Sequence, residues 1–316
     1  MKSKVEQMAK TIGVVVSDRV TAGLVVDHRI KGPLYSFPEN QEEESGLVEL
    51  HTERLVRTIC EQVVRAQGKE VEIAAVGVAL PGLIRNGVVE DSPNLLQLKG
   101  ARIAELLTAE LHAGGLEVPV HILNDADGVA AGLAASTGKL DSFIRVWTLG
   151  IGIGFGRYPF MPGVWEGGHS VVTLDDKENF CGCGGRGHIE GIMGHRAMRL
   201  RFLDMEPEEI FAEARKGGRR EAGAREENDR CKNFVKLWHK ALAAGIATSI
   251  HQDGPGKFLL TGFNVRFVDL ALLKDYVYQM VKMSPIQGYT IEMVEDNVET
   301  RVIGAAVAAE QAAQSR

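Results

Sequence analysis

Apolar positions along the chain follow two spacings, and their alternation predicts a mixed α/β protein. Short runs rich in β-branched and apolar residues are typical of buried strands, whereas apolar residues three to four positions apart are typical of amphipathic helices. In residues 51–67, Leu55, Ile59 and Val63 recur every fourth position, and Gly68 follows as a stop signal. This segment is therefore predicted to be a helix that covers a core.

The same reasoning predicts strands and helices that alternate to the end of the chain. The predicted strands are 11–16, 22–26, 73–80, 118–123, 143–149, 258–261 and 289–293, and Ser17-Asp18-Arg19 is predicted as the tip of a hairpin between the first two. The predicted helices are 51–67, 103–112, 124–138, 233–250, 268–280 and 302–312. Two α/β halves imply sheets covered by helices, with a central cleft between the halves as the natural ligand site. We expect an N-terminal lobe of residues 1–123, completed by the C-terminal helix 298–316, and a second lobe of residues 124–297.

Length and charge narrow the classes of function. A chain of 316 residues is long for one compact core, and its net charge of -6 argues against a nucleic-acid partner. Residues 1–10 lack the apolar core of a secretory signal, and the apolar stretch 241–250 is about half a membrane span, so we expect a cytoplasmic protein without a membrane partner. The mixed charges of residues 207–230 are typical of a solvated face. Four cysteines do not make a disulfide framework, and Cys60 and Cys231 fall in helical patterns typical of packing residues.

The other two cysteines lie close to two histidines in a pattern that suits zinc. Cys181, Cys183 and His188 lie within ten residues, and His169 precedes them. Two thiolates and two imidazoles complete a zinc tetrahedron with no open position, which is typical of a structural site. Glycines at 182, 184, 185 and 187 favour this interpretation because they permit the backbone angles that wrap a chain around an ion. The alternatives are a pair of buried thiols and, for His169 alone, a hydrogen-bonded core histidine.

Carboxylates flank this cysteine and histidine run. Glu166 lies three residues before His169, and Glu190 lies two residues after His188. A metal that fixes the loop would also fix these acceptor-rich side chains around one cavity. The sequence therefore predicts a site for a polyhydroxylated ligand.

Asn124 and Asp125 lie at a predicted strand end, where a helix begins. One interpretation is a helix N-cap, which Asn and Asp commonly form. The other is that Asp125 orients a sugar hydroxyl and accepts its proton late in phosphoryl transfer, because an aspartate is a weak base for an alcohol. The glycine-spaced run 150–156, whose bare amides are suited to phosphate, makes this second interpretation competitive.

Taken together, these segments resemble the ROK group (repressor, open reading frame, kinase) of sugar kinases and regulators. The resemblance runs through residues 11–310 and rests on Leu80-Pro81-Gly82-Leu83-Ile84, Ser92-Pro93-Asn94-Leu95, Asn124-Asp125-Ala126, Glu166-Gly167-Gly168-His169, and the cysteine knuckle that ends in Glu190. It implies the actin-like ATPase fold, with two RNase H-like lobes, and a homodimer. It also implies Asp125 as catalytic base, and sugar contacts from Gly82, Asn94, Asn124, Asp125, Glu166, His169 and Glu190. His169 would bind zinc through one ring nitrogen and sugar through the other, and His188 replaces the third cysteine usual in the family.

The chain departs from this group at the phosphate side. The group's first phosphate loop carries a carboxylate and glycines where this chain has Val15-Val16-Ser17-Asp18-Arg19, and valine cannot hold hydrated magnesium, although Asp18 and Arg19 offer compensation. The second loop has Ile151 in place of a phosphate-binding threonine, and Phe263 replaces one of two glycines. The residues that the resemblance places near nucleotide are Gly150, Gly152, Gly154 and Gly262. We therefore expect a sound sugar site and a degenerate Mg-ATP site.

Two functions follow from this asymmetry. The first is an ATP-dependent phosphotransferase of the glucokinase type, acting on a hexose or amino-sugar hydroxyl. The second is a catalytically impaired sugar sensor or regulator, without direct DNA binding because only about ten residues precede the first predicted strand. A nucleic-acid-binding zinc module is excluded by the charge, while the identity of the sugar and the choice between ATP and polyphosphate stay open.

Overall fold

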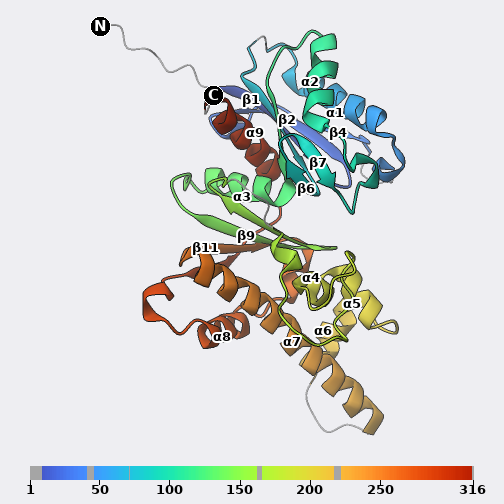
Figure 1. Ribbon diagram of the computed structural model, residues 1–316, viewed down its shortest axis with the longest axis vertical. Coiled ribbons are helices and arrows are strands. Elements are labelled where there is room, and N and C mark those ends of the chain that lie inside the picture. Colours follow the sequence, from blue (N-terminus) through green and yellow to red (C-terminus); the bar gives the residue numbers. More distant parts are fainter. Residues whose placement is uncertain (1–8, 41–45, 71, 162–165, 217–221, 315–316) are drawn as a thin grey trace. The chain divides into compact units, whose positions relative to one another are not determined.

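A computed structural model describes residues 9–40, 46–70, 72–161, 166–216 and 222–314 (Figure 1). The chain divides into two compact units. The first comprises Met1–Ile144, Gly156–Val164 and Asn297–Arg316, and the second comprises Arg145–Phe155 and Trp165–Asp296.

Strands and helices alternate through both units. The strands are β1 (Lys10–Val16), β2 (Val20–Val26), β3 (Arg29–Ile30), β4 (Tyr35–Phe37), β5 (Ala75–Leu80), β6 (Leu83–Arg85), β7 (Val88–Asp91), β8 (Val120–Asn124), β9 (Ile144–Leu149), β10 (Ile153–Tyr158), β11 (Lys257–Thr261) and β12 (Thr290–Met293). The α-helices are α1 (Thr52–Gln67), α2 (Ile103–Ala113), α3 (Asp125–Ser136), α4 (Ile189–Met193), α5 (His195–Arg201), α6 (Pro207–Arg215), α7 (Ala222–Asp253), α8 (Leu270–Met280) and α9 (Val298–Gln314). Short 3-10 turns are η1 (Leu47–Glu49), η2 (Leu96–Leu98), η3 (Gly167–His169), η4 (Phe263–Phe267) and η5 (Ser284–Ile286).

The first unit is built on a sheet of order β3-β2-β1-β5-β8, with β4 beside β2. β1 and β2 form an antiparallel hairpin that closes at the pair Val16 and Val20, while β1, β5 and β8 run parallel. Alternation along β1 sends Ile12 and Val14 into a core shared with α1 and α2, and α9 and α3 lie on the other side (Figure 1). The predicted first hairpin and the predicted helix over 51–67 are confirmed.

Helix α9 packs directly onto backbone because glycines leave no side chain between the two. A Cβ added to Gly13 or Gly77 would lie 1.9 Å from the Val302 carbonyl oxygen or 1.8 Å from that of Ala305. The same holds between helices, where a Cβ on Gly132 of α3 would lie 1.9 Å from the carbonyl oxygen of Thr300. Helix α3, which begins at Asp125, is thus fixed against α9 and belongs to the first unit.

The second unit is built on a sheet of order β10-β9-β11-β12, in which β11 and β12 are parallel. Its core is lined by the apolar face of α7, including Trp238 and Ile246, and by Phe258 of β11. The guanidinium of the fully buried Arg145 lies 4.0 Å from the Phe258 ring and donates to the carbonyls of Ser249 and Gly254, at 3.0 and 2.9 Å. These contacts satisfy a cation inside an otherwise apolar core.

Several elements differ from the sequence predictions at their ends. α7 begins at Ala222 rather than at residue 233, because its charged N-terminal turns carry no apolar signal. α9 begins at Val298, as in the predicted C-terminal helix 298–316, although its apolar spacing alone predicted a start at 302. The chain passes from the first compact unit to the second after Ile144, whereas we predicted a boundary at 123/124. The packing of α3 on α9 accounts for this difference.

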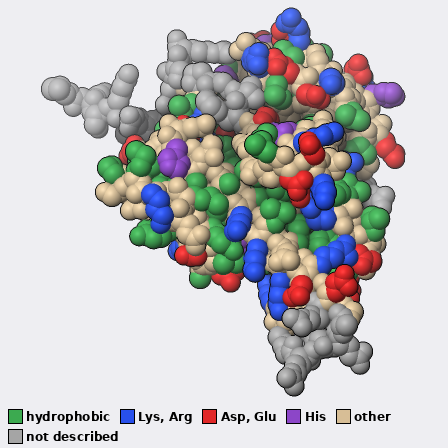
Figure 2. All heavy atoms as spheres, turned by 60° about the horizontal axis from the view of Figure 1, so that its bottom comes forward, with side chains coloured by type: hydrophobic (Ala, Val, Ile, Leu, Met, Phe, Trp, Pro, Cys, Tyr) green, Lys and Arg blue, Asp and Glu red, His purple; other side chains and the backbone are tan. Residues whose placement is uncertain are grey.

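Within the described ranges, no helix combines the length and apolarity needed to cross a bilayer. Figure 2 shows basic and acidic side chains interspersed on the face that it displays. The segment 207–230, predicted as a solvated face, lies partly outside the described residues, at 217–221.

The contact between α9 and the sheet can be tested with one methyl group. We expect Gly77→Ala to lower the free energy of unfolding by at least about 1–3 kcal/mol, because its Cβ would overlap the Ala305 carbonyl and backbone must move. Urea denaturation would measure the change. The control is Gly288→Ala, since a Cβ there meets nothing within 4 Å. Equal stability of the two variants would contradict the close packing.

Candidate functional site

The structure brings the four predicted metal ligands together in the second unit. One ligand atom from each of His169, Cys181, Cys183 and His188 lies within 4.8 Å of the others. The Cys181 sulfur lies 3.4 Å from both the Cys183 sulfur and the His169 Nδ1, and the Cys183 sulfur lies 3.3 Å from the His188 Nδ1. These separations are those of groups that converge on one ion of tetrahedral preference.

Backbone hydrogen bonds close the loop that carries these ligands. Val171 and His188 form an isolated antiparallel bridge, and the amide of Ile189 donates to the Ser170 carbonyl at 3.1 Å. Gly187 has φ of 69°, and a Cβ on Gly185 would lie 2.1 Å from the His188 ring. The glycines are therefore required to wrap the loop, as the sequence predicted.

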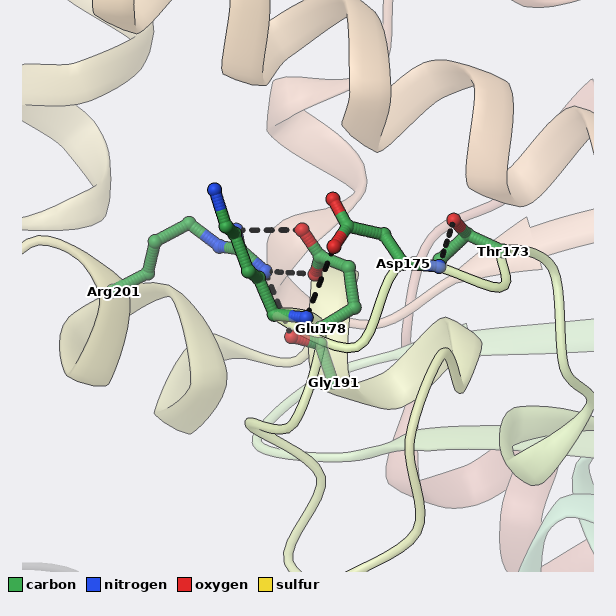
Figure 3. A network of polar contacts seen from close by, with 6 residues as sticks. Thr173, Asp175, Glu178, Gly191 and Arg201 are labelled. Carbon is green, nitrogen blue, oxygen red and sulfur yellow. Dashed lines mark hydrogen bonds and ion pairs between the residues drawn. The ribbon is translucent and has the colours of Figure 1, made fainter.

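An ion pair that the sequence did not reveal holds both ends of this loop (Figure 3). Arg201 of α5 donates to both carboxylate oxygens of Glu178, one at 2.9 Å, and its guanidinium lies 4.4 Å from the Phe180 ring. The same guanidinium lies 3.5 Å from the Gly191 carbonyl, just after Glu190, and the Glu178 carbonyl accepts from the Gly187 amide at 2.6 Å. No local pattern marks this pair because Glu178 and Arg201 are 23 positions apart.

The pKa shifts of Cys181 and His188 are compatible with a metal ion that binds by displacing the thiol proton. Burial raises the pKa of the Cys181 thiol to about 12, so this sulfur keeps its proton until a cation replaces it. Burial, with a smaller contribution from His169, lowers the pKa of His188, so this ring stays neutral and keeps a lone pair. Two sulfurs and two imidazole nitrogens are a donor set that zinc prefers.

The two flanking carboxylates lie beside the cluster. One Glu190 oxygen accepts from the Cys181 thiol at 3.4 Å, and the other accepts from the Ile153 amide at 3.1 Å. Glu166 precedes η3 and still reaches solvent, yet the surrounding protein raises the pKa of its carboxyl by desolvation, opposed by His169 and reinforced by Glu190. The second unit thus holds Glu166, His169 and Glu190 around one loop.

In the first unit, the predicted sugar residues gather at the ends of β5 and β8. Asn124 caps α3 by accepting from the Ala126 amide at 2.9 Å, and its Nδ2 donates to the Gly82 carbonyl at 2.9 Å. Asp125 is half-buried and accepts from the same Ala126 amide. Gly82 has φ of 124°, and Asn94 is exposed in the loop after β7. The N-cap interpretation of Asn124 is confirmed, and its amide is still oriented by the loop that holds Gly82.

Most of the glycines predicted near nucleotide lie around one turn of the second unit. The Gly150 amide donates to the Gly152 carbonyl at 3.0 Å, which closes the turn between β9 and β10. Gly262 has φ of 95°, and a Cβ there would lie 2.5 Å from the Leu149 carbonyl oxygen. Gly154 lies within β10 rather than in the turn, a strand that the glycine spacing concealed.

The hairpin tip at residues 17–19, which we expected in place of a phosphate loop, is closed by its own side chains. Val15 and Val16 are buried, and the Ser17 hydroxyl donates to the Asp18 carboxylate at 2.8 Å. Both terminal nitrogens of Arg19 donate to the Asn40 carbonyl at 2.8 Å. The guanidinium that was expected to compensate for the missing phosphate contacts is therefore engaged in holding a neighbouring loop.

Comparison with known proteins identifies the family. The model of the ROK family matches residues 40–312, which is most of the chain. The chain belongs to the ROK family. The family resemblance seen in the sequence is thereby confirmed.

Relatives of known structure confirm the predicted fold class. The ROK hexokinase from Thermus thermophilus superposes with a TM-score of 0.74 at 20% identity, covering 97% of this chain and 100% of the other. The ROK family glucokinase from Streptomyces griseus, solved in complex with glucose and AMPPNP, gives a TM-score of 0.65 at 20% identity, covering 96% and 100%. In sequence, the chain is 26% identical to a glucokinase from Pyrobaculum calidifontis over 258 residues, 77% of this chain and 80% of the relative. The α/β architecture is therefore the actin-like fold of ROK proteins.

Metal content can be measured directly. We expect about one zinc ion per chain by elemental analysis, and loss of that ion in Cys181→Ser, because a hydroxyl is a poor substitute for a thiolate ligand. Cys231→Ser, which alters a buried cysteine of the α7 core, is the control and should keep the metal. Purified protein that has no zinc and takes up none would contradict the assignment.

The contribution of the Arg201–Glu178 ion pair to stability can be compared with that of an exposed ion pair on the same helix. In Arg201→Leu, Glu178 stays buried without its cation, so we expect a loss of about 3–5 kcal/mol in unfolding free energy and weaker zinc retention against a chelator. Arg199→Leu, on the same helix, removes only an exposed pair with Glu206 and should cost about 0–1 kcal/mol. Comparable losses in both variants would refute the role of Arg201 in closing the loop.

Proposed function

We propose that this protein is a sugar kinase that transfers a phosphoryl group from ATP to a hydroxyl of a hexose or amino-sugar. The observation that carries the proposal is the gathering of Glu166, His169 and Glu190 on one metal-ligand loop in a ROK protein. These groups supply the acceptors and the imidazole that a polyhydroxylated ligand needs. The relatives named glucokinase and hexokinase support the same reaction class.

In this proposal each unit supplies a different part of the chemistry. Asp125 accepts the proton of the attacking hydroxyl late in the transfer, when the oxygen has become acidic through bonding to phosphorus. Asn124, Gly82 and Asn94 contact sugar from the first unit. Glu166, His169 and Glu190 bind sugar hydroxyls from the second, and zinc keeps their loop closed without taking part in the transfer.

The phosphoryl donor is bound mainly by the second unit. Gly150, Gly152 and Gly262 form the phosphate-side turn, with Gly154 in the strand that follows. A bound magnesium ion would supply positive charge to the donor phosphates, and the buried Val15 and Val16 offer no carboxylate to hold it. We therefore expect weak donor binding, with KM for ATP well above that of a relative with a complete first loop.

A second function is favoured by one observation. The hairpin tip at residues 17–19 is closed by the contact of Arg19 with the Asn40 carbonyl, which leaves the first phosphate loop without a free cation in its tip. A protein that kept its sugar residues and lost turnover would act as a sugar sensor. Sugar binding without phosphorylation is its signature.

Removal of the proposed base distinguishes the two functions. We expect Asp125→Asn to lower kcat by about 10²- to 10⁴-fold in a coupled assay with Mg-ATP and a panel of hexoses and amino-sugars, because the amide cannot accept a proton. Asp229→Asn, an exposed position on α7, is the control and should keep wild-type turnover.

Thermal denaturation with each sugar completes this test. A sugar that raises Tm while the wild-type protein shows no turnover would support the sensor and reject the kinase. Turnover that survives Asp125→Asn would reject Asp125 as base, whatever the sugar.

A further inference from the structure

A fully buried amide side chain, that of Asn264, donates a hydrogen bond to the turn between β9 and β10. Asn264 of η4 has no exposed surface, and its Nδ2 donates to the Gly150 carbonyl at 3.0 Å. Its Oδ1 lies 3.2 Å from the Nδ1 of His195, the first residue of α5. The backbone amide of His195 also donates to the Gly150 carbonyl, at 3.1 Å. Both the backbone and the ring of His195 are thus tied to the turn.

These contacts fix the proton on the His195 ring. The Gly150 carbonyl is only an acceptor, so the atom of Asn264 that faces it must be the amide nitrogen. The amide oxygen therefore faces His195, and the Nδ1 of the ring must carry the hydrogen. Nε2 is the nitrogen left for a ligand, and the described residues include no recorded partner for it.

The surroundings of the ring favour an anion on this side of the turn. The Phe263 ring lies 5.3 Å from the His195 ring, edge to face, and sets its orientation. A Cβ at Gly152 would lie 2.5 Å from a Glu190 carboxylate oxygen, and the part of the turn beside this carboxylate would repel a phosphate. When Nε2 also carries a hydrogen, the ring donates an N–H to a phosphate oxygen and adds a positive charge.

We propose that the Nε2 of His195 contacts the phosphates of the phosphoryl donor, and that Asn264 is the positioning residue that aims it. The contact replaces the hydroxyl that Ile151, 65% exposed on the same turn, cannot supply. This inference rests on the proposed kinase function and narrows it, because it names the group on which donor binding depends.

Binding measurements with three probes test the contact. His195→Phe keeps a ring against Phe263 and removes both nitrogens. We expect it to weaken binding of Mg-ATP and of inorganic tripolyphosphate by about 10- to 100-fold, the range for one hydrogen bond to a charged group, and to leave adenosine binding unchanged. Isothermal titration calorimetry measures all three. In the kinase assay, KM for ATP should rise while KM for sugar stays constant.

Two further variants guard against a general structural effect. His251→Phe, in which an exposed histidine of α7 that bonds the Ala247 carbonyl is replaced, is the matched control and should bind all three probes like the wild type. Asn264→Ala, once its Tm shows that it folds, should reproduce part of the loss for tripolyphosphate. If it does not fold, His195→Phe decides alone.

Each alternative outcome overturns the inference in a recognisable way. Loss of adenosine binding with tripolyphosphate binding intact would mean that the ring meets the base. Unchanged binding of all three probes would exclude any contact. If the wild-type protein phosphorylates sugar and His195→Phe has the same KM for ATP, this inference is wrong and the proposed function stands. If the wild-type protein binds neither Mg-ATP nor tripolyphosphate, both the inference and the proposed function are wrong.

Discussion

The second unit depends on the carboxylate of Glu190, which joins the metal-ligand loop to Ile153, 37 positions before it in the sequence. One oxygen accepts from the Cys181 thiol and the other from the Ile153 amide at the start of β10. The metal-ligand loop and the glycine turn are therefore not independent. A change in the position of Glu190 must alter the proposed sugar contacts and the proposed phosphate turn together, since a single side chain holds both.

In the first unit the corresponding constraint is the close packing of helix α9 against glycine residues. Glycines at 13, 77 and 132 let the backbones of β1, β5 and α3 approach α9 within van der Waals contact. Because α3 starts at Asp125, this packing sets where the proposed base lies along the end of β8. Asn124 adds a second restraint through its bond to the Gly82 carbonyl. Backbone packing and the Asn124 bond thus both restrain the position of Asp125.

These two constraints explain which parts of the site the sequence could predict. The candidate ligands His169, Cys181, Cys183 and His188 could be predicted because they are residue types that bind zinc and lie close together in the sequence. The strands and helices with clear periodicity were found for the same local reason. Arg201 and Asn264 were missed because each acts on a partner 23 or 114 positions away, and neither has a neighbour in sequence that hints at this role. β10 was missed because its glycines were read only as a loop, although Ile153 and Tyr158 face the interior.

The two hairpin tips that we propose to lie on the phosphate side differ in the contacts they make. At the β1–β2 tip the flanking valines are buried and the Arg19 guanidinium is satisfied by the Asn40 carbonyl, so a phosphate would have to displace an existing contact. At the β9–β10 turn the glycines are retained, and Asn264 holds an imidazole whose outer nitrogen has the freedom to meet a ligand. The loss of one hydrogen bond to a charged group weakens binding by an order of magnitude or more. The two tips are therefore not expected to contribute equally to phosphate binding. In the proposed function, donor recognition therefore falls to the second unit, where Asn264 bonds the Gly150 carbonyl and Glu190 accepts from the Ile153 amide.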